Sequence, residues 1–251
     1  MPQTILITGG TGKFGRKFVE HFLKKKWRVI FTTTSELRGK TLVKDLGSPD
    51  NLLSLVFDFT ESEAIEKLLI KLKNKGYLVN HLVNNARSLD SLKTDSKGQA
   101  SRTNLMSEYL LDVVVPYELS MSLFNTQSEE LKTITNIGSQ YGLVAANPYL
   151  YDDYPKQSPI QYGIAKAALI HLTKELAIRM ASDKVRVNCI AYGGVDGRVN
   201  SEFKKRYSRL TPMGRMLNDE EIVGSLDFLV SEESLAITGH TLPVDGGWTL
   251  W

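Results

Sequence analysis

The chain of 251 residues has little of what metal sites and disulfide frameworks need, namely one cysteine and four histidines. Cys189 alone excludes an intramolecular disulfide and a cysteine metal cluster, and it is typical of a reducing compartment. The histidines at positions 21, 81, 171 and 240 are scattered without metal-ligand spacing, so we expect them to be structural. The sequence predicts no metal site.

Long apolar runs and a charge imbalance are missing as well. There is no run of 18 or more apolar residues, and residues 1–10 lead into a strand pattern without a basic segment, so neither a membrane span nor a signal peptide is predicted. The net charge of +3 is too small to indicate a nucleic-acid partner. With 42% hydrophobic and 24% charged residues, the composition predicts an ordinary globular protein, which we expect in the cytoplasm.

Short apolar runs alternate with amphipathic segments along the whole chain. Strands are predicted at 4–8, 28–33, 53–57, 81–83, 131–137, 185–190 and 240–244. Helices are predicted at 14–26, 61–75, 106–126, 162–180 and 219–229. This alternation predicts an α/β fold, a Rossmann-type doubly wound parallel sheet with helices on both faces. No repeat or linker divides the chain, so residues 1–251 are predicted to form a single domain.

A glycine-rich turn, Thr8-Gly9-Gly10-Thr11-Gly12-Lys13-Phe14-Gly15, lies between the first predicted strand and the first predicted helix. At this position, helix N–H groups and the positive end of the helix dipole can bind a dinucleotide pyrophosphate, and glycines let the backbone approach it. Taken alone, the turn could also be a tight strand–helix connection. Its position favours a dinucleotide site.

Two further segments carry groups suited to proton transfer. Tyr162 and Lys166 lie four residues apart at the start of a predicted helix and share one face, where an ammonium would favour the phenolate. Ser139 follows a predicted strand, where its hydroxyl could donate to a substrate carbonyl. Taken singly, the first two could be a surface pair and Ser139 a turn residue.

Together and in this order, these segments resemble the short-chain dehydrogenase/reductase superfamily over essentially the whole chain. Asp58 resembles the family's adenine-contacting Asp, and Asn84-Asn85-Ala86 its Asn-Asn-Ala-Gly segment, with Arg87 in place of Gly. The strand Arg186–Ile190 followed by Gly193-Gly194-Val195 is similar to the nicotinamide-holding turn, with Tyr192 in place of Pro. Thr238-Gly239 and Val244-Asp245-Gly246-Gly247 resemble its C-terminal signature.

The resemblance implies an NAD(P)-dependent oxidoreductase that transfers a hydride between nicotinamide and a carbonyl or secondary alcohol. Tyr162 is then the acid–base residue, Lys166 lowers its pKa and holds the nicotinamide ribose, and Ser139 polarises the carbonyl. The family's helix Asn aligns with Asp112, although Asp112 could instead be the Asp that precedes that Asn, with Val114 at the site. A small-molecule substrate and a homodimer or homotetramer are also implied.

The residues expected to contact the cofactor lie in the glycine turn and in segments distributed along the rest of the chain. They are Gly9, Thr11, Lys13, Phe14, Gly15, Thr33, Thr34, Ser35, Arg38, Asp58, Phe59, Asn85, Ala86, Ile137, Tyr162, Lys166, Tyr192, Gly193 and Val195.

Two segments are expected to select the substrate. Tyr162 follows Ser139 by 23 positions, more than is usual in the family, and the additional segment, about 143–160, is rich in tyrosine and aspartate. It resembles a subgroup encoded with flagellin-modification and surface-sugar pathways, which implies a sugar-like substrate; an ordinary surface loop is the alternative. Residues 196–215 are expected to form a lid, whose cations, Arg198 and Arg206 among them, could attract an anionic substrate or belong to a solvated helix face.

The end of the second strand favours NADP over NAD. Enzymes that use NAD usually place a carboxylate there, which binds the ribose hydroxyls and repels a 2′-phosphate. Here Thr33, Thr34 and Ser35 follow one another, and Lys13 and Arg38 could supply positive charge, as in NADP-dependent ketoacyl reductases, which this run also resembles. If Arg38 points to solvent, NAD remains open.

The sequence leaves two alternative functions open. One is a reductase of ketoacyl thioesters. The other is a non-catalytic nucleotide-binding sensor, for which the loss of Tyr162, Lys166 or Ser139 would have been the sign.

Overall fold

The computed structural model describes residues 3–197 and 199–251. Within them, seven strands form one parallel sheet in the order β3-β2-β1-β4-β5-β6-β7. The strands are β1 Thr4–Ile7, β2 Arg28–Thr33, β3 Leu52–Val56, β4 His81–Asn84, β5 Thr133–Ser139, β6 Arg186–Tyr192 and β7 Thr241–Val244. The predicted Rossmann-type sheet is confirmed. Its strand order reverses between β1 and β4, and dinucleotide folds bind their ligand beyond the carboxyl ends of the strands at such a reversal.

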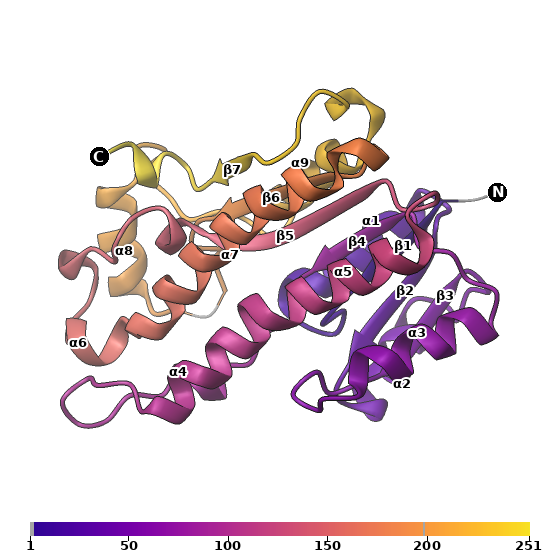
Figure 1. The fold of residues 1–251 in the computed structure, drawn as a ribbon. Coiled ribbons are helices and arrows are strands. Elements are labelled where there is room, and N and C mark those ends of the chain that lie inside the picture. The colour runs from indigo at the N-terminus through magenta and orange to yellow at the C-terminus, as the bar shows by residue number, and fades with distance from the viewer. Residues whose placement is uncertain (1–2, 198) are drawn as a thin grey trace.

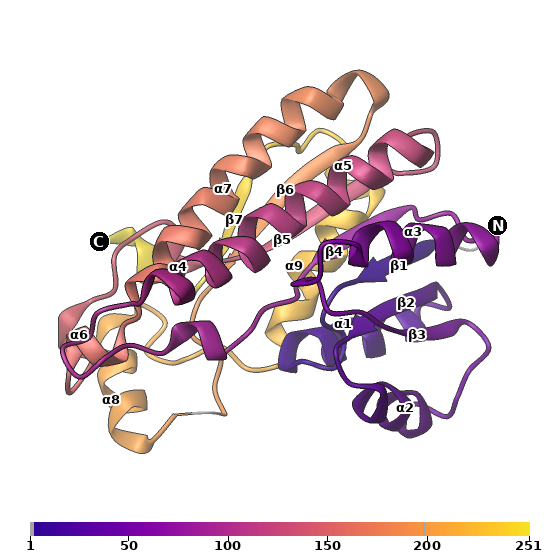
Figure 2. The ribbon, with the colours of Figure 1, turned by 60° about the horizontal axis from the view of Figure 1, so that its bottom comes forward.

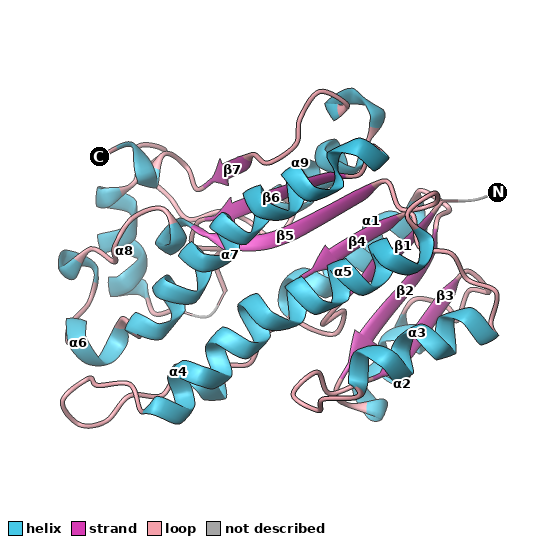
Figure 3. Cartoon of the chain, in the orientation of Figure 1, coloured by secondary structure: helices cyan, strands magenta, loops and turns pink. Residues whose placement is uncertain are grey.

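Helices cover both faces of the sheet (Figure 1). They are α1 Lys13–Lys24, α2 Glu36–Asp45, α3 Ala64–Asn74, α4 Arg102–Tyr109, α5 Val115–Gln127, α6 Tyr154–Gln157, α7 Ile160–Met180, α8 Ser201–Leu210 and α9 Glu221–Val230. Figure 3 shows α4 and α5 end to end in front of the sheet, with α7 running beside them. None of the described helices is long and apolar enough to cross a membrane.

Alternation of side chains along the strands builds two cores, one on each face. In β1, Leu6 belongs to the core under α3, α5 and α7, whereas Ile5 and Ile7 belong to the core under α1, α2 and α9. All three side chains are fully buried. Strands buried on both faces read as continuous apolar runs, which is why β1 was predictable.

Helix α2 lies between β2 and β3, where no helix was predicted. Its apolar face is short, because only Gly39 and Leu42 are buried. Gly39 packs directly on β3: a Cβ at this position would lie 2.4 Å from the Ser54 hydroxyl. Ser35 begins the helix, since its side chain accepts a hydrogen bond from the Arg38 backbone N–H. The cap by Ser35 and the packing of Gly39 and Leu42 thus hold a helix whose amphipathic pattern is weak.

Three other elements differ from their predicted bounds in ways that shape the site. Strands β5 and β6 run on to Ser139 and Tyr192, which pair in register, whereas the predicted strands end earlier. The predicted helix at 106–126 begins at Arg102 and contains a π-helical segment, Leu110–Val114, between α4 and α5. Figure 2 shows α4 and α5 as one continuous rod. π-Helical turns occur mostly as single bulges, frequently at functional sites.

Candidate active site

The glycine turn is held against β4 by a compact set of hydrogen bonds. The Asn85 side-chain amide donates to the carbonyls of Thr8 (2.8 Å) and Gly9 (3.2 Å), while the backbone N–H groups of Asn85 and Ala86 donate to the Thr8 hydroxyl. Gly15 packs directly on the turn, since a Cβ there would lie 2.2 Å from the Gly9 carbonyl oxygen. The turn therefore has no room for a side chain at Gly9 or at Gly15.

Helix α1 starts from this turn and fits a pyrophosphate. Its N-cap residue is Gly12, which has no side chain to cap the first N–H groups. These N–H groups and the positive end of the helix dipole therefore remain for an anion. The residues present thus fit a dinucleotide cofactor.

The end of β2 carries the residues that were predicted to contact the ribose of the cofactor. The buried Thr33 hydroxyl lies 2.9 Å from the Thr11 hydroxyl and accepts a hydrogen bond from the Ser35 backbone N–H. Thr34 and Arg38 are exposed. A surface hollow of about 270 Å³ is lined by Thr11, Arg16, Leu37, Arg38, Thr41 and Leu42. Its second guanidinium, from Arg16, was not predicted from the sequence.

The expectation that Lys13 supplies charge to a 2′-phosphate is wrong. Its ammonium donates to the carbonyls of Val195 and Asp196 and lies 3.1 Å from a carboxylate oxygen of Asp219. Lys13 begins α1, and from there its side chain reaches the segment after β6 and not the end of β2. It ties the glycine turn to the start of the predicted lid.

Several predicted cofactor contacts are placed at the strand ends but are engaged in packing. Phe59 is buried, with its ring 6.5 Å from that of Phe57, and the exposed Asp58 accepts two hydrogen bonds from Thr60. Tyr192 is buried too: its hydroxyl donates to the Ile222 carbonyl, and its ring meets the edge of Phe14 at 5.1 Å. These aromatic side chains fill the core beneath the cleft.

The turn that was predicted to hold the nicotinamide directly follows β6. The Gly193 N–H donates to the Val244 carbonyl, and a Cβ on Gly193 would lie 2.7 Å from Asp245 Cα. Val195 forms a β-bridge with Leu217. The turn is therefore fixed on both sides by backbone contacts.

Ser139, Tyr162 and Lys166 come together at the carboxyl end of β5. Lys166 is buried, donates to the Ile137 carbonyl (3.0 Å) and lies with its ammonium 5.7 Å from the centre of the Tyr162 ring. The Ser139 hydroxyl accepts a hydrogen bond from the Tyr141 N–H, which leaves the hydroxyl hydrogen to be donated.

Asp112 completes the group from the π-helical segment. One of its carboxylate oxygens lies 3.0 Å from the Lys166 ammonium, with both side chains almost fully buried. The structure thus brings Asp112 to Lys166. Within residues 3–197 and 199–251, no three His, Cys, Asp or Glu side chains are grouped to hold a metal ion.

Comparison with known proteins identifies this arrangement. A family model described as enoyl-(acyl carrier protein) reductase matches residues 13–249. The chain is 27% identical to post-translational flagellin modification protein A of Campylobacter coli, over 99% of this chain and 98% of that protein. It is 31% identical to the 3-oxoacyl-[acyl-carrier-protein] reductase FabG of Haemophilus influenzae, over 96% of both.

A solved short-chain dehydrogenase from Leptospira borgpetersenii with bound NAD⁺ superimposes with a TM-score of 0.87 at 29% identity, covering 99% of this chain and 93% of that one. The chain belongs to the short-chain dehydrogenase/reductase family. It is an NAD(P)-dependent oxidoreductase.

In this short-chain dehydrogenase, Arg87 is a site residue that was noted only as a departure from Gly. Arg87 follows the carboxyl end of β4, and its guanidinium carbon lies 4.7 Å from the centre of the Tyr162 ring. A cation over the face of an aromatic ring is attracted by the ring's quadrupole. The replacement of a small residue by Arg beside the Asn85-Ala86 segment was the available signal.

Glu108 is a second residue that was not predicted. It lies one helical turn before Asp112, is buried, and accepts a hydrogen bond from the Ser91 hydroxyl. Burial raises the pKa of the Glu108 carboxyl, and the nearby Asp112 carboxylate raises it further, against the lowering effects of Ser91, Arg87 and Lys166. Glu108 therefore favours its protonated form more than an exposed glutamate does.

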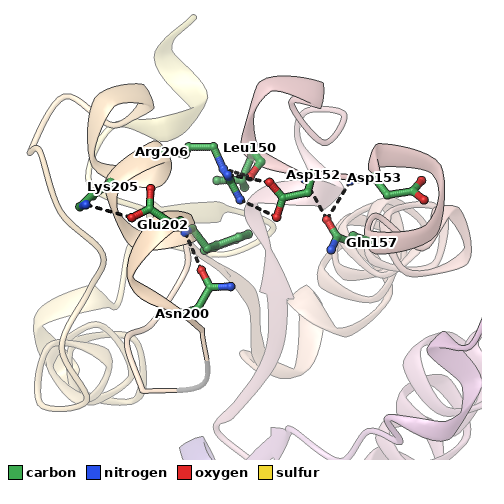
Figure 4. A network of polar contacts seen from close by, with 9 residues as sticks. Leu150, Asp152, Asp153, Gln157, Asn200, Glu202, Lys205 and Arg206 are labelled. Atoms are coloured by element: carbon green, nitrogen blue, oxygen red, sulfur yellow. Dashed lines mark hydrogen bonds and ion pairs between the residues drawn. The ribbon is translucent and has the colours of Figure 1, made fainter.

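The insertion at 143–160 and the lid helix α8 lie against each other (Figure 4). Arg206 of α8 donates to the Leu150 carbonyl and forms a bidentate ion pair with Asp152 at 2.8 and 3.2 Å. Arg206 is thus committed within the protein, which contradicts its predicted role in attracting an anionic substrate. Arg198, the other residue named for that role, lies outside the described residues.

Proposed function

We propose that this enzyme transfers a hydride between NADP(H) and the carbonyl or secondary-alcohol carbon of a polar, hydroxyl-bearing, sugar-like substrate. The convergence of Ser139, Tyr162 and Lys166 at the end of β5 carries this proposal. A non-catalytic sensor would not need a buried lysine and a phenol beside a serine at the reversal of strand order.

Each residue has a distinct part in the chemistry. Bound NADP(H) supplies or accepts the hydride. Ser139 donates a hydrogen bond to the carbonyl oxygen, and Tyr162 gives or takes the proton at that same oxygen. The cations of Lys166 and Arg87 beside the ring stabilise the phenolate, and Asp112 balances the buried charge of Lys166.

The mechanism is tested by Tyr162→Phe, which removes the proton path and leaves the ring in place. We expect turnover to be abolished while NADPH still binds, as measured by initial rates and by fluorescence titration. Near-normal turnover in this variant would contradict the mechanism.

The preference for NADP is supported by the absence of a carboxylate at Thr33 and by the Arg38 guanidinium at the neighbouring hollow, whereas the Arg16 guanidinium is paired with Glu20 and Asp45. Isothermal titration of both cofactors is the direct measurement. Arg38→Ala should weaken NADP and leave NAD unchanged, and Lys40→Ala, on the same helix, serves as the control. Tighter binding of NAD than of NADP by the unmodified protein would refute the preference.

The ketoacyl-thioester alternative is favoured by the 31% identity to FabG. The sugar-like substrate is favoured by the likeness to the flagellin modification protein and by the hydroxyl-bearing insertion beside the site. NADPH oxidation with a panel of keto-sugars, nucleotide keto-sugars and ketoacyl thioesters separates the two. Activity confined to the thioesters would overturn the sugar-like assignment.

A homodimer or homotetramer is supported by apolar side chains exposed on neighbouring helices. They are Leu105, Met106 and Tyr109 of α4, Tyr117 of α5, and Ile160, Ile164 and Ile178 of α7. An exposed apolar surface of this kind marks an association site. Light scattering should give a multiple of the 28.1 kDa chain mass, and Met106→Glu should shift it toward the monomer.

A further inference from the structure

A hydrogen-bonded pair of phenols lies against the catalytic residues. The hydroxyl oxygens of Tyr141 and Tyr151 are 2.7 Å apart. The Tyr141 N–H donates to the Ser139 hydroxyl, and a Cβ on Gly163, the residue after Tyr162, would lie 3.1 Å from the Tyr141 carbonyl oxygen. The backbone of Tyr141 is therefore held between Ser139 and the residue that follows Tyr162.

The residue before Tyr141 is anchored from the nicotinamide turn. The Gly194 N–H donates to the Tyr207 hydroxyl (2.8 Å), which in turn donates to the Gln140 side-chain carbonyl (3.1 Å). Burial raises the pKa of the Tyr141 and Tyr151 hydroxyls, so both remain protonated at neutral pH. The pair thus keeps both of its phenol protons.

The two contacts of Arg206 fix the position of Tyr151. Arg206 binds the carbonyl of Leu150 and the carboxylate of Asp152, the residues on either side of Tyr151 (Figure 4). The Tyr151 ring also meets Phe203 of α8 at 5.9 Å between ring centres. An insertion held in this way positions its tyrosine, unlike a free surface loop.

We propose that Tyr151, oriented by Tyr141, is a specificity residue that hydrogen-bonds a substrate hydroxyl near the reacting carbonyl. One proton of the pair is shared between the two oxygens, so the other can be donated, and each oxygen can still accept. A substrate hydroxyl can accept the proton that the pair does not share, whereas an alkyl ketone has no hydroxyl to accept it. The inference rests on the proposed function, because it takes Ser139 and Tyr162 as the carbonyl site.

The test uses two ring ketones that differ only in their hydroxyl groups, scyllo-inosose (a polyhydroxylated cyclohexanone) and cyclohexanone, with NADPH as reductant. The unmodified enzyme should have the higher kcat/KM for scyllo-inosose. Tyr151→Phe should lower the ratio of the two kcat/KM values by roughly 2- to 12-fold, the effect of one neutral hydrogen bond. Arg206→Ala should lower the same ratio, because the tyrosine loses both of its flanking anchors.

Matched controls are available on the same two elements. Tyr154→Phe removes an insertion hydroxyl outside the pair, and Arg209→Ala removes an exposed cation of α8. Both should leave the ratio unchanged. NADPH affinity and the melting temperature of each variant show whether the fold is retained.

The outcomes separate the inference from the function on which it rests. If the unmodified enzyme reduces neither ketone and no keto-sugar of the panel above, the proposed function is itself contradicted; activity on that panel without activity on scyllo-inosose overturns the role of Tyr151 alone. Equal kcat/KM for the two ketones, or an unchanged ratio in Tyr151→Phe, overturns the role of Tyr151 alone. A ratio that falls together with NADPH affinity also overturns it, because the change is then a general loss of structure.

Discussion

Breaking the buried ion pair between Asp112 and Lys166 should destabilise the enzyme strongly. The two side chains are 1% and 6% exposed, and their charged atoms are 3.0 Å apart. At an effective dielectric constant of about 20, this attraction amounts to roughly 5 kcal/mol. Asp112→Ala leaves Lys166 with the Ile137 carbonyl as its remaining partner. We therefore expect a loss of about 3 kcal/mol or more in the free energy of unfolding.

For a domain of this size, such a loss lowers the melting temperature by roughly 6–12 °C. Asp112→Asn keeps an oxygen that can accept from Lys166 and restores the residue type usual in the family, so it should cost less, about 1–2 kcal/mol. Its turnover should also fall less than that of Asp112→Ala. The control is Glu175→Ala, which breaks an exposed pair with Arg179 and should cost less than about 1 kcal/mol.

A double-mutant cycle with Lys166→Met isolates the pair. Denaturant unfolding of the two single variants and the double variant should give a coupling of about 2 kcal/mol, so the double variant should lose less stability than the sum of the two single losses. A coupling below about 0.5 kcal/mol would refute the reasoning, because the two charges would then act independently.

Three further expectations follow from particular contacts. Arg87→Ala should lower kcat/KM by roughly 2- to 30-fold without changing NADPH affinity, because Tyr162 loses the cation over its ring. Arg87→Lys should recover part of the lost activity. Unchanged kinetics in Arg87→Ala would show that Arg87 does not act on Tyr162. Gly15→Ala should weaken cofactor binding in titrations and cost about 1–3 kcal/mol, because its Cβ meets a backbone oxygen. Gly224→Ala in α9, where a Cβ has open space, should be neutral or stabilising. Burial lowers the pKa of His81 to about 3 from an ordinary 6.5, so only the unfolded chain binds this proton between those values. Stability should fall as the pH drops through that range, by at most about 5 kcal/mol, and acid unfolding of His81→Phe should show a shallower fall.

The sheet and the position of Tyr162 beside Lys166 were predictable because each depends on local pattern. A buried strand such as β1 reads as an apolar run, and Tyr162 and Lys166 share a helix face by spacing alone. Helix α2 was missed because its packing rests on Gly39 and one leucine, which give almost no periodic signal.

The direction of long side chains could not be predicted. Lys13 lies in the glycine turn by sequence, yet its ammonium reaches residues after β6. Arg206 was predicted either to attract an anionic substrate or to lie on a solvated helix face, and its partner Asp152 lies in an insertion distant in sequence. Such pairings depend on how elements pack in three dimensions, and charge composition alone does not specify them.

The π-helical segment at Leu110–Val114 sets the phase between α4 and α5. A single added residue turns everything beyond it by about 100° around an α-helix axis, and a π turn absorbs that rotation. As a result α5 can keep Leu119 and Leu123 in the sheet core while Asp112 faces Lys166. The site is therefore sensitive to chain length at this point. Deleting one residue here, even an apolar one such as Leu111, would rotate α5 relative to α4. Either the core contacts of α5 or the pairing of Asp112 with Lys166 would then be lost, although no catalytic side chain would have been changed.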